Sequence, residues 1–367
     1  MKRKIRRIAV NTGGGDAPGL NAVIRAVVLS ACRRGWEVIG LRKGYLGLLD
    51  TSHLVQLTPE SVRGLTHLGG SILGTVNRGN PLEYPFKLPD GSVTIIDRSD
   101  EIVASYKNLG LDALVAIGGE GSMRIASALA QKGMEIVGVP KTIDNDLAGT
   151  VATFGFDTAV TVATEALDRL HTTAESHERV FVVEVMGRYA GWIALHAGVA
   201  GGADVILIPE IPYDIEAVCR KIMDREAQGR HFSIVVVAEG AKPVDGEMVW
   251  KDGEAAGRER RLGGIGEKVA AEIAAQTGKE TRCVVLGHLQ RGGRPTSRDR
   301  ILALEFGAAA VRLIAQGKSS IMVALDPPDV RAVPLSSVTG RMRTVPLDDD
   351  CLLAARDMGL SLGDEPE

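Results

Sequence analysis

Aromatic residues are scarce in this sequence, long apolar runs are missing, and neither sign of charge dominates. Phe, Trp and Tyr together make up 4% of the 367 residues. No window has the apolar length that a membrane span needs, so we expect no membrane segment. The 43 basic and 46 acidic residues give a net charge of −3, which argues against a nucleic-acid partner and against a polybasic membrane patch.

Cysteine is also sparse. The four cysteines are scattered through apolar stretches, a pattern typical of reduced core residues and not of disulfides or a metal site. They are Cys32, Cys219, Cys283 and Cys351. The basic cluster near the N-terminus runs straight into a strand-like segment at Ile8–Val10, without the apolar stretch of a signal peptide. We therefore expect a cytoplasmic protein.

Glycine, in contrast, is abundant, with 44 residues, and the length of the chain suits two domains. Short β-rich runs alternate with helical patterns from end to end, which predicts a mostly parallel sheet with helices on both faces. The expected strands are Ile8–Val10, Glu37–Leu41, Ala113–Ile117, Ile136–Val139, Val180–Val185, Val205–Ile208, Ser233–Ala238 and Cys283–Leu286. The expected helices are Pro18–Arg33, Ser122–Gln131, Thr158–Thr173, Ala190–Ala200, Ile215–Gln228, Gly266–Gln276 and Ser297–Ala315.

Three stretches are predicted to lack regular structure. Tyr84–Gly91 and Lys242–Arg261 are polar and are expected to form surface loops. The last residues, Gly363–Glu367, are expected to form a frayed acidic tail.

A first glycine-rich turn follows the strand at Ile8–Val10 and opens a helix. Gly13, Gly14 and Gly15 let backbone amides approach a phosphate, and the helix N-terminus near Pro18 adds a favourable dipole for an anion. A plain tight turn is the alternative, because a glycine-rich turn alone is a weak signal.

A second such turn, Gly118-Gly119-Glu120-Gly121-Ser122, follows the strand at Ala113–Ile117 and also enters a helix. Two turns at the ends of neighbouring strands are suited to flank one polyphosphate. Glu120 is either a Mg²⁺ ligand, directly or through water, or a helix N-terminal acid stabilised by the dipole.

Two aspartates follow the strand at Ile136–Val139, within Pro140-Lys141-Thr142-Ile143-Asp144-Asn145-Asp146. Phosphoryl transfer needs a carboxylate to accept the hydroxyl proton and a metal site to neutralise the polyphosphate, and one aspartate can serve each role. A D-x-D pattern also occurs in Asx-turns. The glycine-rich turns upstream favour the catalytic interpretation.

These motifs and two more resemble those of the phosphofructokinase family in order and spacing. The resemblance extends from about residue 6 to about residue 325. The motifs are Gly14-Gly15-Asp16-Ala17-Pro18-Gly19, Gly118-Gly119-Glu120-Gly121-Ser122, Lys141-Thr142-Ile143-Asp144-Asn145-Asp146, Glu184-Val185-Met186-Gly187-Arg188 and Leu286-Gly287-His288-Leu289-Gln290-Arg291-Gly292-Gly293.

The resemblance implies an α/β fold of two Rossmann-like, three-layer αβα domains with mostly parallel sheets and the active site in the cleft between them. The larger, nucleotide-binding domain is expected at 1–154 plus about 291–340, and the smaller, sugar-phosphate-binding domain at about 155–290 plus about 341–367. The implied reaction is the phosphorylation of fructose 6-phosphate at its 1-hydroxyl by ATP with Mg²⁺. It gives fructose 1,6-bisphosphate and ADP and is the committed step of glycolysis.

The resemblance also assigns catalytic roles. Asp144 would be the base that deprotonates the sugar hydroxyl, with Asp146 beside it at the metal and the sugar. Thr142 and Arg188 would stabilise the transferring phosphoryl group. Glu120 would help to hold Mg²⁺, where the commoner family residue is aspartate.

Sugar-phosphate binding is assigned to a second group of residues. Besides Thr142, Asp144, Asp146 and Arg188, they are Arg179, Met186, Gly187, Glu239, Arg282, His288 and Arg291. The three arginines and His288 would hold the 6-phosphate, because the planar fork of arginine binds two phosphate oxygens. In this family Arg179 and Arg282 reach the site from a neighbouring subunit, so we expect a homo-oligomer, either a dimer or a tetramer.

The residues assigned to ATP are Gly15, Tyr45, Arg78, Gly118, Gly119, Gly121 and Ser122. Two positions distinguish ATP users from pyrophosphate users. Gly121 indicates ATP, since it leaves room for the α-phosphate and the nucleoside where pyrophosphate enzymes tend to have aspartate. Lys141 is typical of pyrophosphate enzymes, but a cation beside phosphates suits either donor. A carboxylate in place of Gly121 would exclude ATP, whereas Lys141 only adds a favourable charge, so Gly121 is the stronger argument. We therefore expect ATP as the donor, with a pyrophosphate-dependent, reversible enzyme as the alternative.

The effector pocket of the allosteric bacterial relatives binds ADP and phosphoenolpyruvate through basic residues. Arg25 is retained, but Leu29 and His171 stand at positions of other arginines, and a lysine pair is replaced within Arg230-His231-Phe232. Losing cations weakens a phosphate site, so we expect weak or absent control by these two effectors.

Two other classes of function remain as alternatives. Lipid and NAD kinases use a similar glycine-rich turn but should lack the motifs around Met186 and His288. A non-catalytic, nucleotide-sensing subunit usually loses the base or the arginine clamp, and this chain has Asp144, Asp146 and Arg188.

Overall fold

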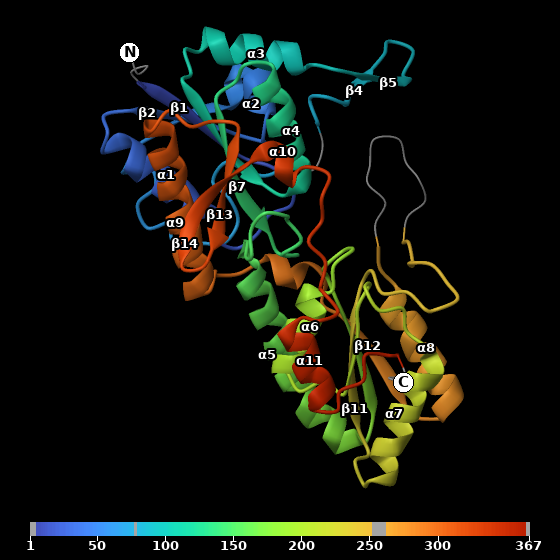
Figure 1. Ribbon diagram of the computed structural model, residues 1–367. Coiled ribbons are helices and arrows are strands. Elements are labelled where there is room, and N and C mark those ends of the chain that lie inside the picture. The colour runs from blue at the N-terminus through green and yellow to red at the C-terminus, as the bar shows by residue number, and fades with distance from the viewer. Residues whose placement is uncertain (1–4, 77–78, 252–261, 365–367) are drawn as a thin grey trace. The chain divides into compact units, whose positions relative to one another are not determined.

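A computed structural model describes residues 5–76, 79–251 and 262–364 of the chain. Internal contacts divide the chain into two compact units, each built from segments that are far apart in sequence (Figure 1). Unit 1 comprises Met1–Thr142, Leu147–Asp157 and Arg291–Met342. Unit 2 comprises Ile143–Asp146, Thr158–Gln290 and Arg343–Glu367.

Unit 1 is built on an eight-stranded sheet and a separate hairpin. Its strands are β1 (Arg7–Thr12), β2 (Glu37–Leu41), β3 (Leu54–Leu57), β4 (Tyr84–Lys87), β5 (Val93–Ile96), β6 (Ala113–Gly118), β7 (Ile136–Thr142), β8 (Phe154–Gly155), β13 (Ile321–Asp326) and β14 (Asp329–Pro334). The sheet order is β14-β13-β7-β6-β1-β2-β3, with β8 beside β7. The inner pairs are parallel, and the outer pairs β2–β3 and β13–β14 are antiparallel.

The helices of unit 1 connect these strands. They are α1 (Leu20–Cys32), α2 (Leu46–Leu49), η1 (Thr51–His53), α3 (Ser99–Asn108), α4 (Glu120–Gln131), α9 (Ser297–Ala315) and α10 (Leu335–Val338). The long helix α5 (Phe156–His177) begins in unit 1 and continues into unit 2.

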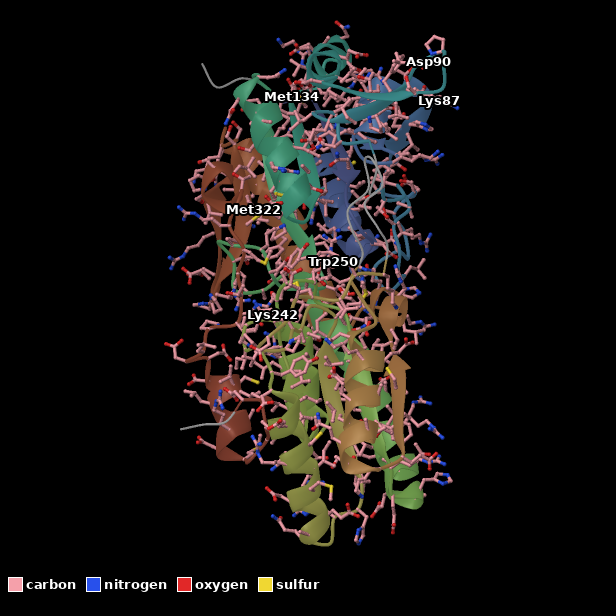
Figure 2. All side chains as sticks on the ribbon, turned by 90° about the vertical axis from the view of Figure 1, so that its right-hand side faces the viewer. Lys87, Asp90, Met134, Lys242, Trp250 and Met322 are labelled. Carbon is pink, nitrogen blue, oxygen red and sulfur yellow. The ribbon has the colours of Figure 1, made fainter. Side chains whose placement is uncertain are left out.

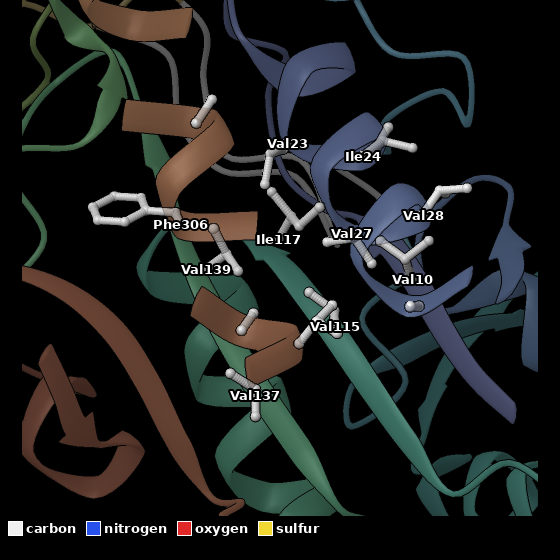
Figure 3. Close-up of a cluster of buried hydrophobic side chains, with 14 of the residues drawn as sticks. Val10, Val23, Ile24, Val27, Val28, Val115, Ile117, Val137, Val139 and Phe306 are labelled. Atoms are coloured by element: carbon white, nitrogen blue, oxygen red, sulfur yellow. The ribbon is translucent and has the colours of Figure 1, made fainter. Parts of the chain in front are cut away.

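Alternate residues of the central strands point to opposite faces of the sheet, as a strand requires. Val115 and Ile117 pack on one face with α1 and with Phe306 of α9 (Figure 3). Leu114 and Ile136 pack on the other face with α3 and α4. Full burial of one such side chain contributes about 1.5–3 kcal/mol, so both faces hold the strand ends in place.

Unit 2 is built on four parallel strands in the order β10-β11-β9-β12. They are β9 (Val180–Val185), β10 (Val205–Leu207), β11 (Ser233–Ala238) and β12 (Thr281–Val285). The remaining elements are α6 (Trp192–Ala200), α7 (Ile215–Ala227), α8 (Ile265–Thr277), η2 (Gly287–Arg291, whose last residue is in unit 1) and α11 (Asp350–Asp357). Helices α7 and α8 share a core with Val205 and Leu207, while Gly198 of α6 faces Ile206, which points to the other side.

Every strand and helix range expected from the sequence overlaps an observed element, and the prediction of mostly parallel sheets is confirmed. The expectation of a loop at Tyr84–Gly91 was wrong in part, because its first residues form β4. This strand pairs with β5, and the turn is closed by Asp90, whose carboxylate accepts the Ser92 N–H at 2.9 Å. Lys87 and Asp90 lie toward the tip of this hairpin (Figure 2).

The other two irregular stretches are described in part. In the expected loop Lys242–Arg261, Trp250 forms an antiparallel bridge with Leu262, and residues 252–261 lie outside the described part. The expectation of a frayed tail was wrong for its first residues. The Asp214 N–H donates to the Gly363 carbonyl at 2.6 Å, and Arg356 pairs with Asp364. Residues 365–367 lie outside the described residues.

All four cysteines are free thiols, with Cys219 buried and the others half-buried. Within residues 5–76, 79–251 and 262–364, no helix combines the length and the apolar character required to cross a membrane.

Candidate active site

The two glycine-rich turns lie together at one edge of unit 1. The strand order reverses at β1, since β2 lies on one side of it and β6 on the other. Sheets of this kind bind ligands beyond the carboxyl ends of their strands at such a reversal. One turn follows β1 and the other follows β6, and the Gly13 N–H donates to the Ile117 carbonyl at 2.9 Å. The structure therefore brings both predicted phosphate-binding turns side by side.

Some glycines of these turns are required by close packing, and others are not. A Cβ on Gly118 would lie 2.2 Å from Ser122 Oγ, and one on Gly13 would lie 2.6 Å from the same atom. Packing of the two turns therefore requires glycine at both positions. A Cβ on Gly121 would meet no atom within 4 Å. Packing does not require glycine there, and its small size leaves open space at the start of α4.

Two cations border the first turn. Lys141 is buried, and its Nζ donates to the Gly15 carbonyl. Arg291 Nη1 donates to the Asp16 carbonyl at 3.1 Å, and a Cβ on Gly15 would lie 2.9 Å from that nitrogen. Arg291 therefore lies in unit 1 beside the first glycine-rich turn, whereas His288, which was predicted to bind the same phosphate, belongs to unit 2.

Glu120 is the first residue of α4 and is half-buried, and its Oε1 accepts the Gly340 N–H at 3.1 Å. In the part of the chain that the structure describes, no three His, Cys, Asp or Glu side chains form a cluster able to hold a metal ion. Kinases usually hold Mg²⁺ through one or two carboxylates together with substrate phosphates and water. A single carboxylate beside a phosphate-binding turn fits that requirement.

Tyr45 and Arg78 were also assigned to ATP. Tyr45 is buried at the start of α2, and this burial raises the pKa of its hydroxyl, while the nearby Asn11 side chain acts in the opposite direction. Arg78 lies outside the described residues.

In unit 2, the loops after β9 and β11 meet at one edge, since these neighbouring strands are parallel. Arg188 follows β9 with a positive φ of 51°, and its N–H donates to Glu239 Oε1 at 3.1 Å. Glu239 follows β11 and donates its N–H to the Val185 carbonyl at 2.8 Å. A Cβ on Gly240 would lie 1.8 Å from the Arg188 carbonyl oxygen, so glycine there lets the two loops touch.

The electrostatics of this edge connect Glu239 with Asp144. Burial raises the pKa of Glu239, the N–H of Arg188 lowers it, and the negative charges of Asp144 and Glu184 raise it again. Asp144 itself is 5% exposed. Two carboxylates and the Arg188 backbone are thus collected in a largely dry part of unit 2, where charges interact strongly.

The loop after β12 is tied to the loop after β9 by Gln290. This side chain is fully buried, and its Oε1 accepts the Met186 N–H at 3.4 Å while its Nε2 donates to the Gly287 carbonyl at 3.1 Å. These two bonds connect the segment that carries Met186 with the segment that carries His288. Both residues are predicted to bind the sugar phosphate. Gln290 had no assigned role in the sequence, although it stands inside the motif that carries His288.

Arg179 and Arg282 lie at the opposite end of the same sheet. Arg179 directly precedes β9, whereas Arg188 follows it, and Arg282 is near the start of the parallel strand β12. A strand of six residues is roughly 20 Å long. Both guanidinium groups pair with the carboxylate of Glu280, with Arg179 Nε 2.8 Å from Glu280 Oε2. Within unit 2, these two arginines are therefore not brought together with Arg188 and Glu239.

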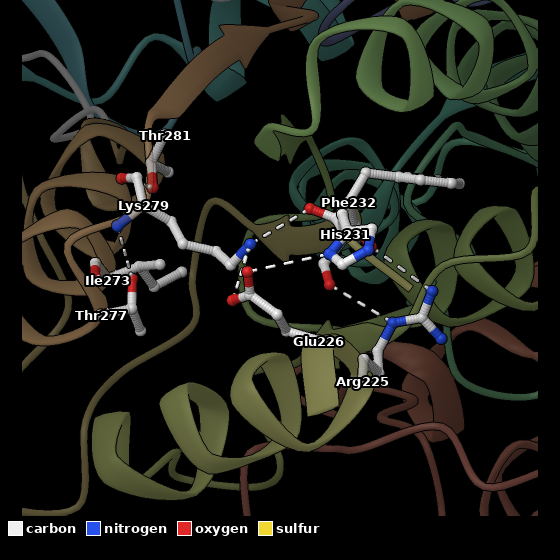
Figure 4. Close-up of polar contacts among 9 residues, drawn as sticks. Arg225, Glu226, His231, Phe232, Ile273, Thr277, Lys279 and Thr281 are labelled. Carbon is white, nitrogen blue, oxygen red and sulfur yellow. Dashed lines mark hydrogen bonds and ion pairs between the residues drawn. The ribbon is translucent and has the colours of Figure 1, made fainter. Parts of the chain in front are cut away.

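Basic side chains around the end of α7 are engaged in contacts within unit 2 (Figure 4). Lys279 Nζ lies 2.8 Å from Glu226 Oε2 and 3.2 Å from the His231 carbonyl. Arg225 Nη1 lies 2.7 Å from Asp204 Oδ1. The carboxylates therefore neutralise much of the positive charge of this region.

His171 belongs to the same region, at a position where the resemblance places a cation of the effector pocket. Its Nε2 lies 2.7 Å from the Gly201 carbonyl oxygen, and its ring meets Phe232 edge-on with centroids 5.9 Å apart. A histidine packed in this way offers little to a phosphate.

Unit 1 carries paired glycine-rich turns, and unit 2 carries carboxylates with an arginine. These features are typical of enzymes that transfer phosphoryl groups. Residues 7–314 match the family described as Phosphofructokinase, and the chain belongs to this family.

Individual relatives include users of both phosphoryl donors. The chain is 54% identical over 366 residues to the ATP-dependent 6-phosphofructokinase of Chloroflexus aurantiacus, covering 100% of both chains. It is 51% identical over 342 residues to the pyrophosphate–fructose 6-phosphate 1-phosphotransferase of Amycolatopsis methanolica, covering 93% of this chain and 96% of that protein. The solved phosphofructokinase of Pichia pastoris in the T-state is 32% identical with a TM-score of 0.77, and the match covers 92% of this chain and 35% of that one.

Proposed function

We propose that this chain is an ATP-dependent 6-phosphofructokinase, which moves the γ-phosphoryl group of ATP to the 1-hydroxyl of fructose 6-phosphate. The products are fructose 1,6-bisphosphate and ADP. The observation that carries the proposal is the pair of glycine-rich turns at the strand-order reversal of unit 1, with open space at Gly121, in a chain whose whole length matches enzymes of this name. The proposal includes a role in glycolysis and a cytoplasmic location.

The choice of donor rests on Gly121 and not on identity, since a pyrophosphate enzyme is 51% identical. Gly121 is exposed, and the space around its Cβ position suits the α-phosphate and nucleoside that ATP has and pyrophosphate lacks. Lys141 argues less strongly for pyrophosphate than its residue type indicates, because its Nζ is already bonded to the Gly15 carbonyl. Its charge serves the phosphate-binding turn whichever donor is bound.

The chemical step would use residues of the segment after β7 and of the edge of unit 2. Asp144 accepts the proton of the 1-hydroxyl as the sugar oxygen attacks the γ-phosphorus, and ADP leaves. The guanidinium of Arg188 and the hydroxyl of Thr142 stabilise the charge on the transferring group. The low exposure of Asp144 strengthens these interactions, because little water competes with them.

The sugar would be held mainly by unit 2. Met186, Gly187 and Glu239 line it, and His288 binds its 6-phosphate from the loop that Gln290 anchors. Arg291, beside Gly15, adds positive charge for phosphate.

The metal requirement follows from the charge of the donor. When bound, Mg²⁺ would neutralise part of the negative charge of the polyphosphate. Glu120 and Asp146 are the carboxylates proposed to hold it, Glu120 by way of water. Glu120 keeps one carboxylate oxygen, Oε2, outside the hydrogen bond that Gly340 makes to Oε1.

We also propose a homo-oligomer in which Arg179 and Arg282 serve the site of a neighbouring subunit. The position of both arginines at the far end of the sheet from Arg188 supports this assignment. Within one subunit both arginines pair with the carboxylate of Glu280. A sugar phosphate is an anion that the same two guanidinium groups can bind.

The donor assay tests the proposed activity directly. Initial rates with fructose 6-phosphate and Mg²⁺ are compared with ATP or pyrophosphate as donor. Turnover with ATP is expected. Turnover with pyrophosphate alone would mean that Lys141 outweighs Gly121, and turnover with neither donor would contradict the proposed function.

A mixing experiment tests the shared site. Subunits with Arg179→Ala and subunits with Asp144→Asn are each expected to be nearly inactive. Co-refolded mixtures should regain activity, because some sites then combine an intact Asp144 with an intact Arg179 from the neighbour. The control is a mixture of Arg188→Ala with Asp144→Asn, two changes to the same subunit's site, which should stay inactive. No recovery in the first mixture would contradict the shared site.

A further inference from the structure

Arg343 connects the C-terminal segment of unit 2 to the segment that carries Asp144 and Asp146. Its backbone N–H donates to the Asp146 carbonyl at 2.8 Å. Its Nη1 donates to the Asn145 carbonyl at 3.1 Å, across 198 positions of sequence. Two consecutive carbonyls of this segment thus receive hydrogen bonds from one residue.

The guanidinium of Arg343 is itself held in place from the other side. It lies over the indole ring of Trp192, 3.9 Å from the ring centroid, and Trp192 Nε1 donates to the Arg343 carbonyl at 3.0 Å. Such stacking uses the planar, delocalised charge of arginine, which lysine lacks. Trp192 is 2% exposed, so its ring gives the guanidinium a rigid support.

Trp192 directly follows the loop that carries Arg188. It is the first residue of α6, and the preceding Gly191 donates its N–H to the Glu210 carboxylate at 3.0 Å. Glu210 Oε1 also accepts the Val345 N–H at 2.8 Å, two residues beyond Arg343. The C-terminal segment is therefore bonded both to the start of α6 and to the aspartate segment.

The aspartate segment needs such support because of its backbone. Asn145 has a φ of 53°, in the left-handed region that is unfavourable for most residues. Asparagine tolerates this conformation but does not enforce it. Rotation of the Asn145–Asp146 peptide would change the direction of the aspartate side chains on either side of Asn145, and the bonds from Arg343 oppose that rotation.

We propose that Arg343, supported by Trp192, is a positioning residue that fixes the Asp144–Asp146 segment relative to the Arg188 loop within unit 2. This inference rests on the proposed function, because it assigns Arg343 a role in the same phosphoryl transfer. Arg343 acts through the carbonyls of Asn145 and Asp146 and does not touch the substrates in this role.

The central test is Arg343→Met, which keeps the length of the side chain and removes its donors and its charge. We expect kcat to fall by roughly 10- to 100-fold, the loss that accompanies a misplaced reacting group, with the KM for ATP changed by less than about twofold. Arg343→Lys should recover part of kcat, since an ammonium group can reach one carbonyl but cannot stack as a plane. The matched control is Arg356→Met, which removes a cation from α11 of the same unit and leaves the carbonyls untouched.

Thermal unfolding separates positioning from a purely structural role. If Arg343 only stabilises the fold, Arg343→Met lowers Tm but has the kcat of the parent at a temperature where both are folded, and the inference is overturned. If Arg343→Met does not fold, Arg343→Lys and Trp192→Phe replace it, and parental kcat in both overturns the inference. An inactive parent chain would overturn the proposed function as well, whereas an active parent with a fully active Arg343→Met would overturn this inference alone.

Discussion

Replacing Gly121 with aspartate should weaken the use of ATP relative to pyrophosphate without disturbing the fold. A Cβ at this position meets no atom within 4 Å, and the residue does not have the positive φ that would strain a side chain. Gly121 is the second residue of α4, where a negative charge interacts favourably with the helix dipole by about 0.3–1 kcal/mol. The Tm of Gly121→Asp should therefore equal or slightly exceed that of the parent.

The effect on ATP follows from charge repulsion. A carboxylate about 4 Å from an α-phosphate oxygen costs about 1 kcal/mol in water-like surroundings and about 4 kcal/mol near a protein surface. Since Gly121 is exposed, the cost lies between these limits, and kcat/KM for ATP should fall by about 10- to 100-fold. Pyrophosphate has no α-phosphate or nucleoside, so its kcat/KM should not fall.

The assay compares kcat/KM for both donors and Tm in the parent and three variants. Gly121→Ala, which adds volume without charge, should stay close to the parent with ATP. Gly118→Ala should lose stability instead, because its methyl group would lie 2.2 Å from Ser122 Oγ, and overpacking of this kind costs about 1–3 kcal/mol. The reasoning is refuted if Gly121→Asp retains the parental kcat/KM for ATP, or if it loses several degrees of Tm.

Three further predictions concern the proposed base Asp144, the half-buried carboxylate of Glu239 and the effectors. Asp144→Ala should lower kcat by roughly 10²–10⁴-fold when assayed well below its Tm, and unaltered turnover would exclude Asp144 as the base. Burial raises the pKa of Glu239 above its usual 4.5, so the native state favours the protonated carboxyl and the parent loses stability as pH rises through that pKa. The Tm of Glu239→Gln minus that of the parent should thus be larger at about pH 8 than at about pH 4, and equal differences would contradict this reasoning. Neither ADP nor phosphoenolpyruvate should strongly shift the fructose 6-phosphate saturation curve, because Leu29 and His171 stand where the effector pocket has arginines and the ring of His171 is packed against Phe232. A strong shift at low effector concentration would show that an effector site remains.

Much of the fold could be predicted because strands and helices have local signatures. The apolar run at Val180–Val185 and the helical pattern at Ser297–Ala315 were predicted with the bounds that the structure has. Hairpin β4–β5 was missed because its residues are mixed in polarity and alternate only weakly, so pairing across the turn decides its structure.

The candidate site was predictable where its residues stand in compact motifs. Glycine-rich turns after strands, and paired aspartates after another strand, can be read from consecutive residues. Gln290, Trp192 and Arg343 could not be found in this way. Their partners lie on other strands or near the other end of the chain, and no spacing along the sequence indicates such contacts.

The sequence by itself determined the alternation of strands and helices, the phosphate-binding turns and the carboxylates, because each depends on neighbours within a few residues. Tertiary structure decided which of these residues meet. It brought the turns after β1 and β6 together at the strand-order reversal, put Arg291 beside Gly15, and left Arg179 at the far end of β9 from Arg188. The physical reason is that strand order and direction are set by packing the apolar faces of whole elements, and contacts between distant segments follow from that packing.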